Sequence, residues 1–290
     1  MIRVEDLHRH FGGFRAVDGA SLTIETGSIT GLIGPNGAGK STLFNVIAGV
    51  LPPTSGRVFM DGEDISGLPP HELFHKGLLR TFQLAHEFSS MTVRENLMMV
   101  PGAQSGETIW KTWFQRGRIE REEAELKRKA DEVLDFLTIR HLTHEKAGNL
   151  SGGQKKRVFL ARAIAQEAQV ILLDEPFTGV DVQTEQAIIA LLKAMRDEGR
   201  VMLVSTHDLG SVPEYCDRVV MVKGTVLAHG PTETTFTPEN LRHAFGGVLR
   251  HFVLGGAALH DDADQRSLDV FTDDERPLVF YDQRARRKDE

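Results

Sequence analysis

One nine-residue segment combines the residue types that hold a phosphate chain. It reads Gly34-Pro35-Asn36-Gly37-Ala38-Gly39-Lys40-Ser41-Thr42. The segment fits G-x-x-x-x-G-K-[S/T], in which glycines let successive backbone N–H groups turn toward phosphate oxygens. Lys40 is expected to reach the β- and γ-phosphates, and the Ser41 hydroxyl to ligate Mg²⁺. The pattern predicts a nucleoside triphosphate with Mg²⁺ as the substrate. The loop residues expected to contact it are Gly34, Asn36, Gly37, Gly39, Lys40, Ser41 and Thr42.

A second candidate site follows a run of four apolar residues at 170–173, which are succeeded by Asp174, Glu175 and Pro176. A carboxylate at the end of a buried strand can hold Mg²⁺, directly or through water, so Asp174 is a candidate metal ligand. Glu175 could then act as general base on the attacking water. An acidic turn is the simpler interpretation of such a segment in isolation. Downstream of a phosphate-binding loop, we prefer the catalytic one.

The elements that must position these residues alternate between strands and helices. Residues 29–33 form an apolar run that predicts a buried strand entering the loop, and 40–48 predict a helix closed by Gly49. The N-terminus of that helix adds a favourable dipole beneath the phosphates. After residue 151 the alternation resumes. The expected elements there are strands at 170–173 and 201–205 and a helix at 182–196 that ends at Gly199.

Residues 86–150 have a different pattern, typical of helices. Thr92 and Glu95 fit a capping box that opens a helix. Apolar residues recur at helical spacing further on, at Leu126, Ala130, Val133, Leu134 and Leu137. We therefore predict a helical segment inserted into an α/β core. Three aromatic residues are expected to pack inside it, although a partner-binding face is the alternative: Trp110, Trp113 and Phe114.

Composition limits the remaining possibilities. The chain has 290 residues and a net charge of -7, which argues against general affinity for nucleic acid. Its one cysteine, Cys216, excludes an intramolecular disulfide, and we expect it to be a small buried hydrophobe. No apolar run is long enough to span a bilayer, and we expect no secretory signal at the start. If the protein serves a membrane, we expect it to do so as a peripheral subunit.

A third motif combines a serine and two glycines directly before a predicted helix. Residues Leu150-Ser151-Gly152-Gly153-Gln154 precede a predicted helix at 155–165. A serine hydroxyl and glycine N–H groups at a helix N-terminus form an anion site, and the serine can also cap the helix. With the phosphate loop before it and the Asp174–Glu175 pair after it, this segment resembles the signature of ATP-binding cassette (ABC) ATPases. The resemblance covers about residues 2–230.

The resemblance implies a fold and a division of the chain. The fold is an α/β P-loop NTPase core with an antiparallel β subdomain and an inserted α-helical subdomain. The ABC ATPase domain would span 1–235, with the helical subdomain at about 86–150, and a tail of one helix and an acidic extension would occupy 236–290. An apolar stripe at helical spacing in the tail is expected to pack on the core or on a second subunit: Leu241, Ala244, Phe245, Val248, Leu249 and Phe252.

The family also implies roles for further residues. Gln83 resembles the glutamine that ligates the metal, senses the γ-phosphate and faces the permease. Asp181 resembles the D-loop aspartate and is expected to belong to the nucleotide-binding residues, and His207 resembles the switch histidine that contacts the γ-phosphate. Phe11 stands where the family has an adenine-stacking aromatic, and Phe14 is a rival for that role.

In the family, two cassettes pair head to tail. Each ATP would lie between Lys40 of one subunit and the signature residues Ser151, Gly153 and Gln154 of the other. The second cassette could be identical or a paralogue. Hydrolysis opens the pair and drives a membrane permease, which would place this chain peripherally on the cytoplasmic face. An extracytoplasmic solute-binding protein would be an indirect partner.

Two subfamilies of importer share the resemblance. Residues 1–150 are similar to branched-chain amino-acid importer cassettes, through Gly77-Leu78-Leu79-Arg80-Thr81-Phe82-Gln83 and Met91-Thr92-Val93-Arg94-Glu95-Asn96-Leu97. Residues 160–290 are similar to manganese, iron and zinc importer cassettes. Three segments carry that likeness: Asp174-Glu175-Pro176-Phe177-Thr178-Gly179-Val180-Asp181, Ser205-Thr206-His207-Asp208-Leu209-Gly210-Ser211-Val212-Pro213 and Ala244-Phe245-Gly246-Gly247-Val248-Leu249-Arg250-His251-Phe252.

We therefore predict branched-chain amino acids as the transported solute, with manganese, iron or zinc as the alternative, because in the family the permease docks near Gln83 in the front half. The tail favours metal ions. The likeness of the two halves to different subfamilies could come from natural recombination or from a fused reading frame.

Two other functions compete with that of an importer ATPase. Soluble ABC proteins that act on ribosomes or DNA usually have tandem cassettes or long insertions, whereas this chain has one cassette. A degenerate, non-hydrolysing cassette would be expected to lack a catalytic residue, and Glu175 and His207 are both present.

Overall fold

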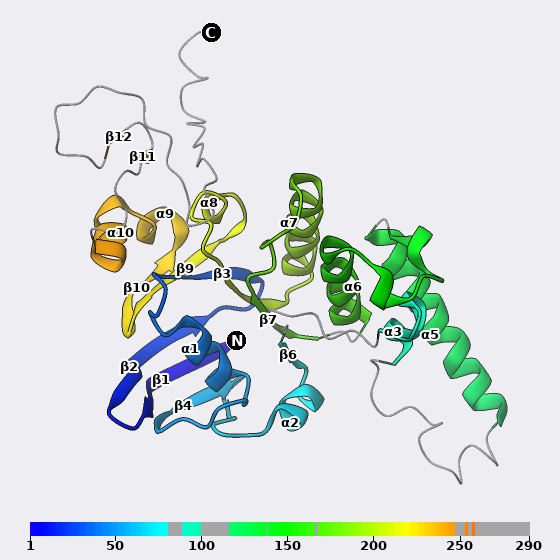
Figure 1. Ribbon diagram of the computed structural model, residues 1–290. Coiled ribbons are helices and arrows are strands. Elements are labelled where there is room, and N and C mark those ends of the chain that lie inside the picture. The colour runs from blue at the N-terminus through cyan, green and yellow to red at the C-terminus, as the bar shows by residue number, and fades with distance from the viewer. Residues whose placement is uncertain are drawn as a thin grey trace, which may run out of the picture. The chain divides into compact units, whose positions relative to one another are not determined.

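The computed structural model describes residues 1–80, 89–99, 116–137, 139–165, 168–246, 253–254 and 257–258 (Figure 1). The chain forms two compact units. Unit 1 contains residues 1–69 and 201–290, and unit 2 contains residues 70–200. The phosphate loop lies in unit 1, and the signature segment lies in unit 2.

Unit 1 begins with an antiparallel sheet of order β2-β1-β4-β5. Its strands are β1 (Ile2–Phe11), β2 (Phe14–Ile24), β4 (Ser55–Met60) and β5 (Glu63–Asp64). Ile2, Val4 and Leu7 of β1 are buried, and the pairing of β1 with β2 shifts register between Val4 and Leu7. This sheet agrees with the antiparallel subdomain that the family resemblance implied.

The second group of strands in unit 1 carries the phosphate loop. Strand β3 (Ser28–Ile33) runs parallel to β8 (Val201–Ser205) and to β9 (Arg218–Lys223), and β10 (Thr225–Pro231) pairs antiparallel with β9. Every residue of β3 and β8 is buried, which explains why these strands are continuous apolar runs without alternation.

Helix α1 (Lys40–Ile47) follows β3 and contacts β1 and β2. The helix ends one residue earlier than predicted, because Ala48 is its C-cap and Gly49 then adopts a positive φ of 69°.

Short elements complete the described part of unit 1. Helix α8 (Val212–Tyr215) lies between β8 and β9 in the chain, and β10 is followed by α9 (Thr232–Thr235), α10 (Pro238–Phe245), β11 (Val253–Leu254) and β12 (Ala257–Ala258). Helix α10 packs on β9 and β10 and buries Leu241 and Ala244, so this part of the tail packs on the core as predicted. Phe245 of the expected stripe is half-buried, and its remaining positions, 248, 249 and 252, lie outside the described residues. Cys216 is buried, which confirms its prediction as a small interior residue.

Unit 2 combines two parallel strands with a group of helices. Its elements are α2 (Pro70–His75), β6 (Leu78–Arg80), α3 (Val93–Met98), α5 (Arg116–Phe136), η2 (Arg140–Leu142), η3 (Ala147–Asn149), α6 (Gly152–Ala165), β7 (Val170–Asp174) and α7 (Val182–Asp197). Strand β6 is parallel to β7. Helices α3, α5 and α6 pack against one another, so the packed helical group extends to residue 165.

The helix signals in unit 2 are confirmed where the structure describes them. Thr92 caps α3, and its side chain and that of Glu95 bond reciprocally to each other's backbone N–H. Ala130, Leu134 and Leu137 are buried along the apolar stripe. The predicted packing of Trp110, Trp113 and Phe114 lies outside the described residues.

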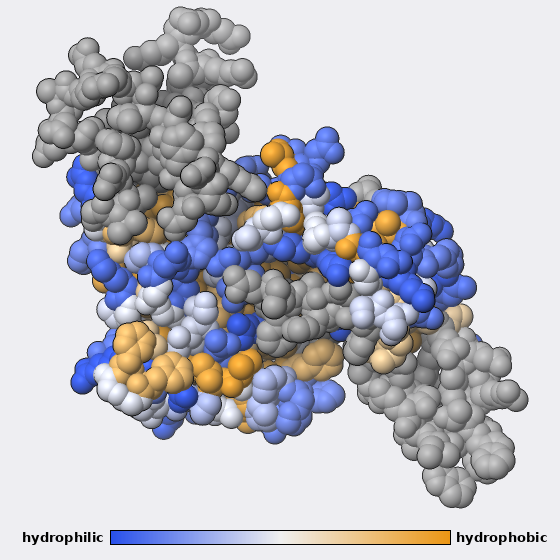
Figure 2. Space-filling model, viewed as in Figure 1, coloured by the Kyte–Doolittle hydropathy of each residue, from blue (hydrophilic) through white to orange (hydrophobic). Residues whose placement is uncertain are grey.

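The visible face of the described residues is largely hydrophilic, with a hydrophobic band over the area that β1, β2 and β4 occupy in Figure 1 (Figure 2). None of the helices in the described ranges has the length and apolar character of a membrane span.

Candidate functional site

The phosphate loop joins the buried end of β3 to the first turn of α1. Gly39 is the N-cap of α1, with φ 93°, and no side chain caps the helix. Gly39 therefore contributes no side chain to the first backbone N–H groups of α1, and a helix N-terminus of this kind suits an anion.

Two glycines allow the loop to lie close against its neighbours. A side chain at Gly34 would collide with the carbonyl oxygen of Val222, and one at Gly39 with that of Ala16. The loop is also tied to the β9–β10 turn, because the Gly224 amide donates to the Ala38 carbonyl over 2.8 Å. Larger residues would push the loop away from β2 and β9, so these glycines set its position.

Lys40 is held within the loop. Its side chain is buried, and Nζ donates to the carbonyl oxygens of Gly34 (2.5 Å) and Pro35 (3.0 Å). These bonds keep the ammonium in the concave side of the loop. Four other predicted contact residues at the loop tip and first helical turn are exposed or half-buried: Asn36, Gly37, Ser41 and Thr42.

His207 is placed at the same edge of the strands as the phosphate loop. Leu32 of β3 pairs with Ser205 of β8 in parallel register, and the Thr206 amide donates to the Leu32 carbonyl over 3.4 Å. The carboxyl ends of β3 and β8 therefore lie together, which is where ligands bind in open α/β sheets. His207 is half-buried there.

The two candidate aromatics flank one turn. Phe11 ends β1, Phe14 begins β2, and the two residues are paired across the hairpin. Both are exposed, at 45% and 64%. The Arg9 guanidinium lies 4.6 Å from the centre of the Phe11 ring, so one face of that ring is covered. Exposure leaves both aromatics open as stacking platforms.

In unit 2, Asp174 ends β7 and is buried beside a cation. The Arg80 Nη2 atom of the neighbouring strand β6 lies 3.5 Å from Asp174 Oδ2, and the two side chains are only 10% and 7% exposed. Burial lowers the pKa of Arg80, whereas the nearby Asp174 carboxylate acts to raise it. The sequence alone gives Arg80 no role, because its pairing with Asp174 depends on the parallel register of β6 and β7.

Glu175 has a backbone conformation that non-glycine residues rarely adopt. Its φ is 50°, and its side chain is half-buried. The Thr178 hydroxyl donates to Glu175 Oε2 over 3.3 Å. Lys156 of α6 donates to the Glu175 carbonyl (3.4 Å) and to the Thr178 carbonyl. Lys156 thus ties the signature helix to this turn, and only the tertiary structure shows that contact.

The signature segment forms a capping box. Ser151 Oγ accepts from the Gln154 amide (3.3 Å), and Gln154 Oε1 accepts from the Ser151 amide (2.9 Å). The prediction that Ser151 caps the helix is confirmed.

Gly153 lies beside Asp181, the N-cap of α7. A side chain at Gly153 would lie within 4 Å of Thr184 and Asp181. Asp181 accepts from the Thr184 amide (2.9 Å) and hydroxyl (2.6 Å). These hydrogen bonds lower the pKa of Asp181. Arg157 of α6 donates to the same hydroxyl over 2.6 Å, so one network links the signature helix to α7.

The predicted residues therefore fall into two groups. Unit 1 contains the phosphate loop and His207. Unit 2 contains Asp174, Glu175, the signature residues and Asp181. Gln83 lies outside the described residues.

These observations match a known family. The model of the ABC transporter family matches residues 17–178, from β2 to the turn after Glu175. The chain belongs to the ABC transporter family. It is an ABC ATPase, as its three motifs predicted, and ATP is its nucleotide.

Two relatives show which ABC ATPases it is similar to. It is 48% identical to the chelated iron transport system membrane protein YfeB of Yersinia pestis over 270 residues, which are 93% of this chain and 86% of that protein. It is 39% identical to the probable branched-chain amino acid transport ATP-binding protein LivG of Methanocaldococcus jannaschii. That match covers 234 residues, 80% of this chain and 90% of the relative.

A solved ABC cassette has the same fold. The dimeric, post-hydrolysis structure of the ATP-binding cassette MJ0796 with bound ADP and phosphate gives a TM-score of 0.65 at 28% identity. The match covers 80% of this chain and 98% of that one. The resemblance inferred from the motifs, in fold and in enzyme class, is confirmed.

Proposed function

We propose that this ABC ATPase is the energy-supplying subunit of an importer, and that it couples ATP hydrolysis to solute uptake through a separate membrane permease. The observation that carries the proposal is the phosphate loop, with its uncapped α1 N-terminus and buried Lys40, in a chain of this family. The subunit would lie peripherally on the cytoplasmic face of the membrane.

The phosphate loop would hold the triphosphate. Backbone N–H groups between Gly34 and Thr42 would face its oxygens, and Lys40 would exchange its bonds to the loop carbonyls for bonds to the β- and γ-phosphates. His207, at the same strand edge, would contact the γ-phosphate. The exposed ring of Phe11 would stack on adenine through the face that Arg9 leaves uncovered, and Phe14 is the alternative platform.

Mg²⁺ fits the donor set of the chain. The Ser41 hydroxyl and the Asp174 carboxylate offer hard oxygen ligands, which Mg²⁺ prefers, and Gln83 would offer a third. Arg80 holds the Asp174 side chain at the end of β7. The ion would neutralise phosphate charge.

Glu175 would act as the general base. Its strained φ of 50° marks a position whose geometry the surrounding structure imposes, and such residues concentrate at functional sites. Its carboxylate would accept a proton from the attacking water. Replacement by Gln removes the base but keeps the shape, so turnover should fall by about 100- to 10,000-fold.

A second cassette would complete the site. Ser151 and Gly153 lie at the N-terminus of α6, where the backbone N–H groups suit a phosphate, as the family's head-to-tail pairing requires. The dimeric relative with ADP and phosphate supports this arrangement. Gln154 and Asp181 would support the signature segment, because each is bonded to its helix terminus.

For the solute, we propose a metal ion or its chelate. The front half of the sequence favours branched-chain amino acids, and the LivG relative supports that alternative. The YfeB relative, however, is more similar and matches 93% of the chain, which includes parts of both halves. One relative similar across the chain also supports a single lineage over a fused reading frame.

The test is permease-stimulated ATPase activity. The chain is co-expressed with an iron or manganese permease and, separately, with a branched-chain amino-acid permease pair. Stimulation by the first supports metal uptake, and stimulation by the second refutes it. The Glu175→Gln variant is the control in both, because it should bind the permease without turnover. Basal ATPase activity equal in Glu175→Gln and wild type would refute the assigned base.

A further inference from the structure

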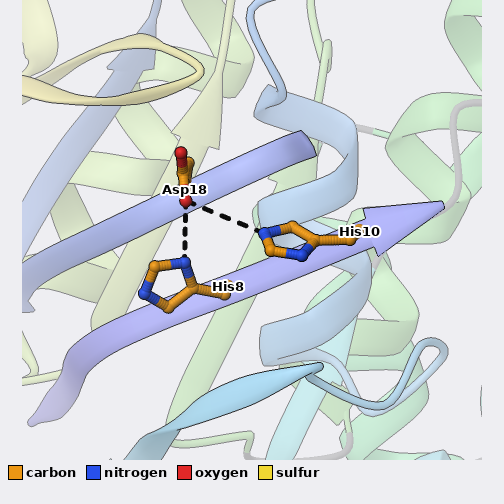
Figure 3. Close-up of side chains that lie close together, drawn as sticks. All are labelled: His8, His10 and Asp18. Carbon is orange, nitrogen blue, oxygen red and sulfur yellow. Dashed lines mark hydrogen bonds and ion pairs between the residues drawn. The ribbon is translucent and has the colours of Figure 1, made fainter. Parts of the chain in front are cut away.

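A cluster of two histidines and one aspartate lies outside the phosphate loop and the signature segment. His8 and His10 lie on β1, and Asp18 lies on the paired strand β2. One donor atom from each lies within 4.8 Å of the other two. Figure 3 shows both imidazole rings directed at the Asp18 carboxylate.

The distances suit a four-coordinate metal ion. His8 Nδ1 lies 2.9 Å from Asp18 Oδ1, and His10 Nε2 lies 3.7 Å from the same oxygen. Ligand atoms at about 2.0–2.1 Å from a tetrahedral ion are about 3.3 Å apart, so the two observed separations bracket that value. A water molecule would complete the coordination.

The contacts of the His8 ring call for one more positive charge than a neutral imidazole supplies. His8 contacts a carboxylate oxygen at each ring nitrogen, Asp18 at Nδ1 and Asp6 at Nε2 (3.1 Å). A neutral imidazole has only one N–H, so one of these contacts requires an added proton or a cation. Among the described residues, His10 Nε2 is buried without a hydrogen-bond partner and is directed to the same place.

The surroundings provide the outer support that metal-binding histidines have. In the tautomer that carries its proton on Nε2, His8 donates to Asp6, and its Nδ1 lone pair then faces Asp18. Asp6 itself has a positive φ of 45° at the register shift of β1, and bulges of this kind redirect side chains. Arg15 bonds Asp18 Oδ2 at 3.1 Å, so Oδ1 is the oxygen turned toward the histidines.

The cluster is also accessible. The side chains of His8, His10 and Asp18 are 23%, 29% and 38% exposed, so the cluster borders the solvent. Two imidazoles with one carboxylate favour zinc-like transition metals over Mg²⁺ or Ca²⁺.

We propose that His8, His10 and Asp18 bind a divalent transition-metal ion of the zinc class, with Asp6 as the residue that orients His8. The site is independent of the transported solute and of the Mg²⁺ that accompanies ATP. It lies near the nucleotide elements: Phe11 follows His10, and the Asp18 amide donates to the Gly224 carbonyl over 2.8 Å.

The test is a Co²⁺ titration of the full chain without a histidine tag and without ATP, which itself chelates metals. Four-coordinate Co²⁺ gives visible absorption bands, and Zn²⁺ should displace it. We expect saturable absorption in wild type. His10→Gln should lower the affinity for Co²⁺ by at least about 100-fold, and Asp6→Asn should lower it by about 10- to 100-fold. Glu5→Gln removes the same charge one residue from Asp6, and His229→Ala removes an exposed histidine of unit 1. Both of these variants should bind Co²⁺ with the affinity of the wild type.

Circular dichroism of each variant confirms folding. If His10→Gln fails to fold, Asp18→Asn is the second variant, because it keeps the shape of the side chain and removes the negative charge. Equal affinities of wild type and the folded variant would overturn the proposal, as would the absence of saturable Co²⁺ absorption. Loss of ATPase activity in Glu175→Gln leaves metal binding unchanged, so failure of the proposed function and failure of this site are distinguishable.

Discussion

Breaking the pair between Arg80 and Asp174 should strongly destabilise unit 2. Both side chains are at least 90% buried, and their charged atoms lie 3.5 Å apart. Replacing Arg80 with Met keeps the stem but removes the cation beside a buried carboxylate. Breaking a buried pair in this way typically costs about 3–5 kcal/mol.

The free-energy cost of breaking the pair can be expressed as a decrease in melting temperature. An unfolding entropy of about 2.1 cal/mol/K per residue gives about 0.6 kcal/mol/K for a chain of this length, so Arg80→Met should melt about 5–8 °C lower if the chain unfolds cooperatively. The measurement is a thermal melt followed by circular dichroism without nucleotide. Arg128→Met is the matched control. It breaks an exposed pair with Glu132 at 2.5 Å and should change the melting temperature by about 1 °C or less.

A second variant separates charge from packing. Asp174→Leu combined with Arg80→Met replaces the ion pair by apolar side chains and should recover most of the lost stability. An Arg80→Met protein that melts within about 1 °C of wild type would refute the reasoning, since the buried carboxylate would then not depend on Arg80.

Three further predictions follow from individual contacts. Gly39→Ala should destabilise the chain by about 1–3 kcal/mol and weaken ATP binding, because φ is 93° and the added carbon meets the Ala16 carbonyl. Denaturant and ATP titrations measure the two effects, and Gly13→Ala is the control, because a side chain there would lie in open space. Burial raises the pKa of the Cys216 thiol, so a thiol reagent should label it only after unfolding, and rapid labelling of the native protein would contradict this. Hydrogen bonds from Thr184 lower the pKa of Asp181 and so stabilise the folded protein. This stabilisation is present above the unfolded pKa of about 3.9 and is lost as pH falls through the lower folded pKa. Thr184→Val should therefore lower the urea midpoint most above about pH 5 and progressively less below about pH 4, whereas a pH-independent difference would count against it.

Several elements followed from local sequence alone. The phosphate loop, the Thr92–Glu95 capping box and the Ser151–Gln154 cap involve residues three to eight positions apart, so their types and spacing were sufficient. The buried strands at 170–174 and 201–205 were predictable because strands covered on both faces are continuous apolar runs.

Other features depend on residues that are distant along the chain. The pairing of Arg80 with Asp174 requires β6 and β7 to be neighbours in parallel register, and no local pattern specifies that neighbour. The same holds for the contact of Lys156 with the Glu175 turn.

The sequence by itself determined the chemistry of this protein, because phosphate binding relies on a short segment whose backbone geometry is encoded by glycines at fixed spacing. Only the tertiary structure brought His8 and His10 to Asp18, because strand pairing and a bulge, not sequence spacing, set which side chains meet across β1 and β2.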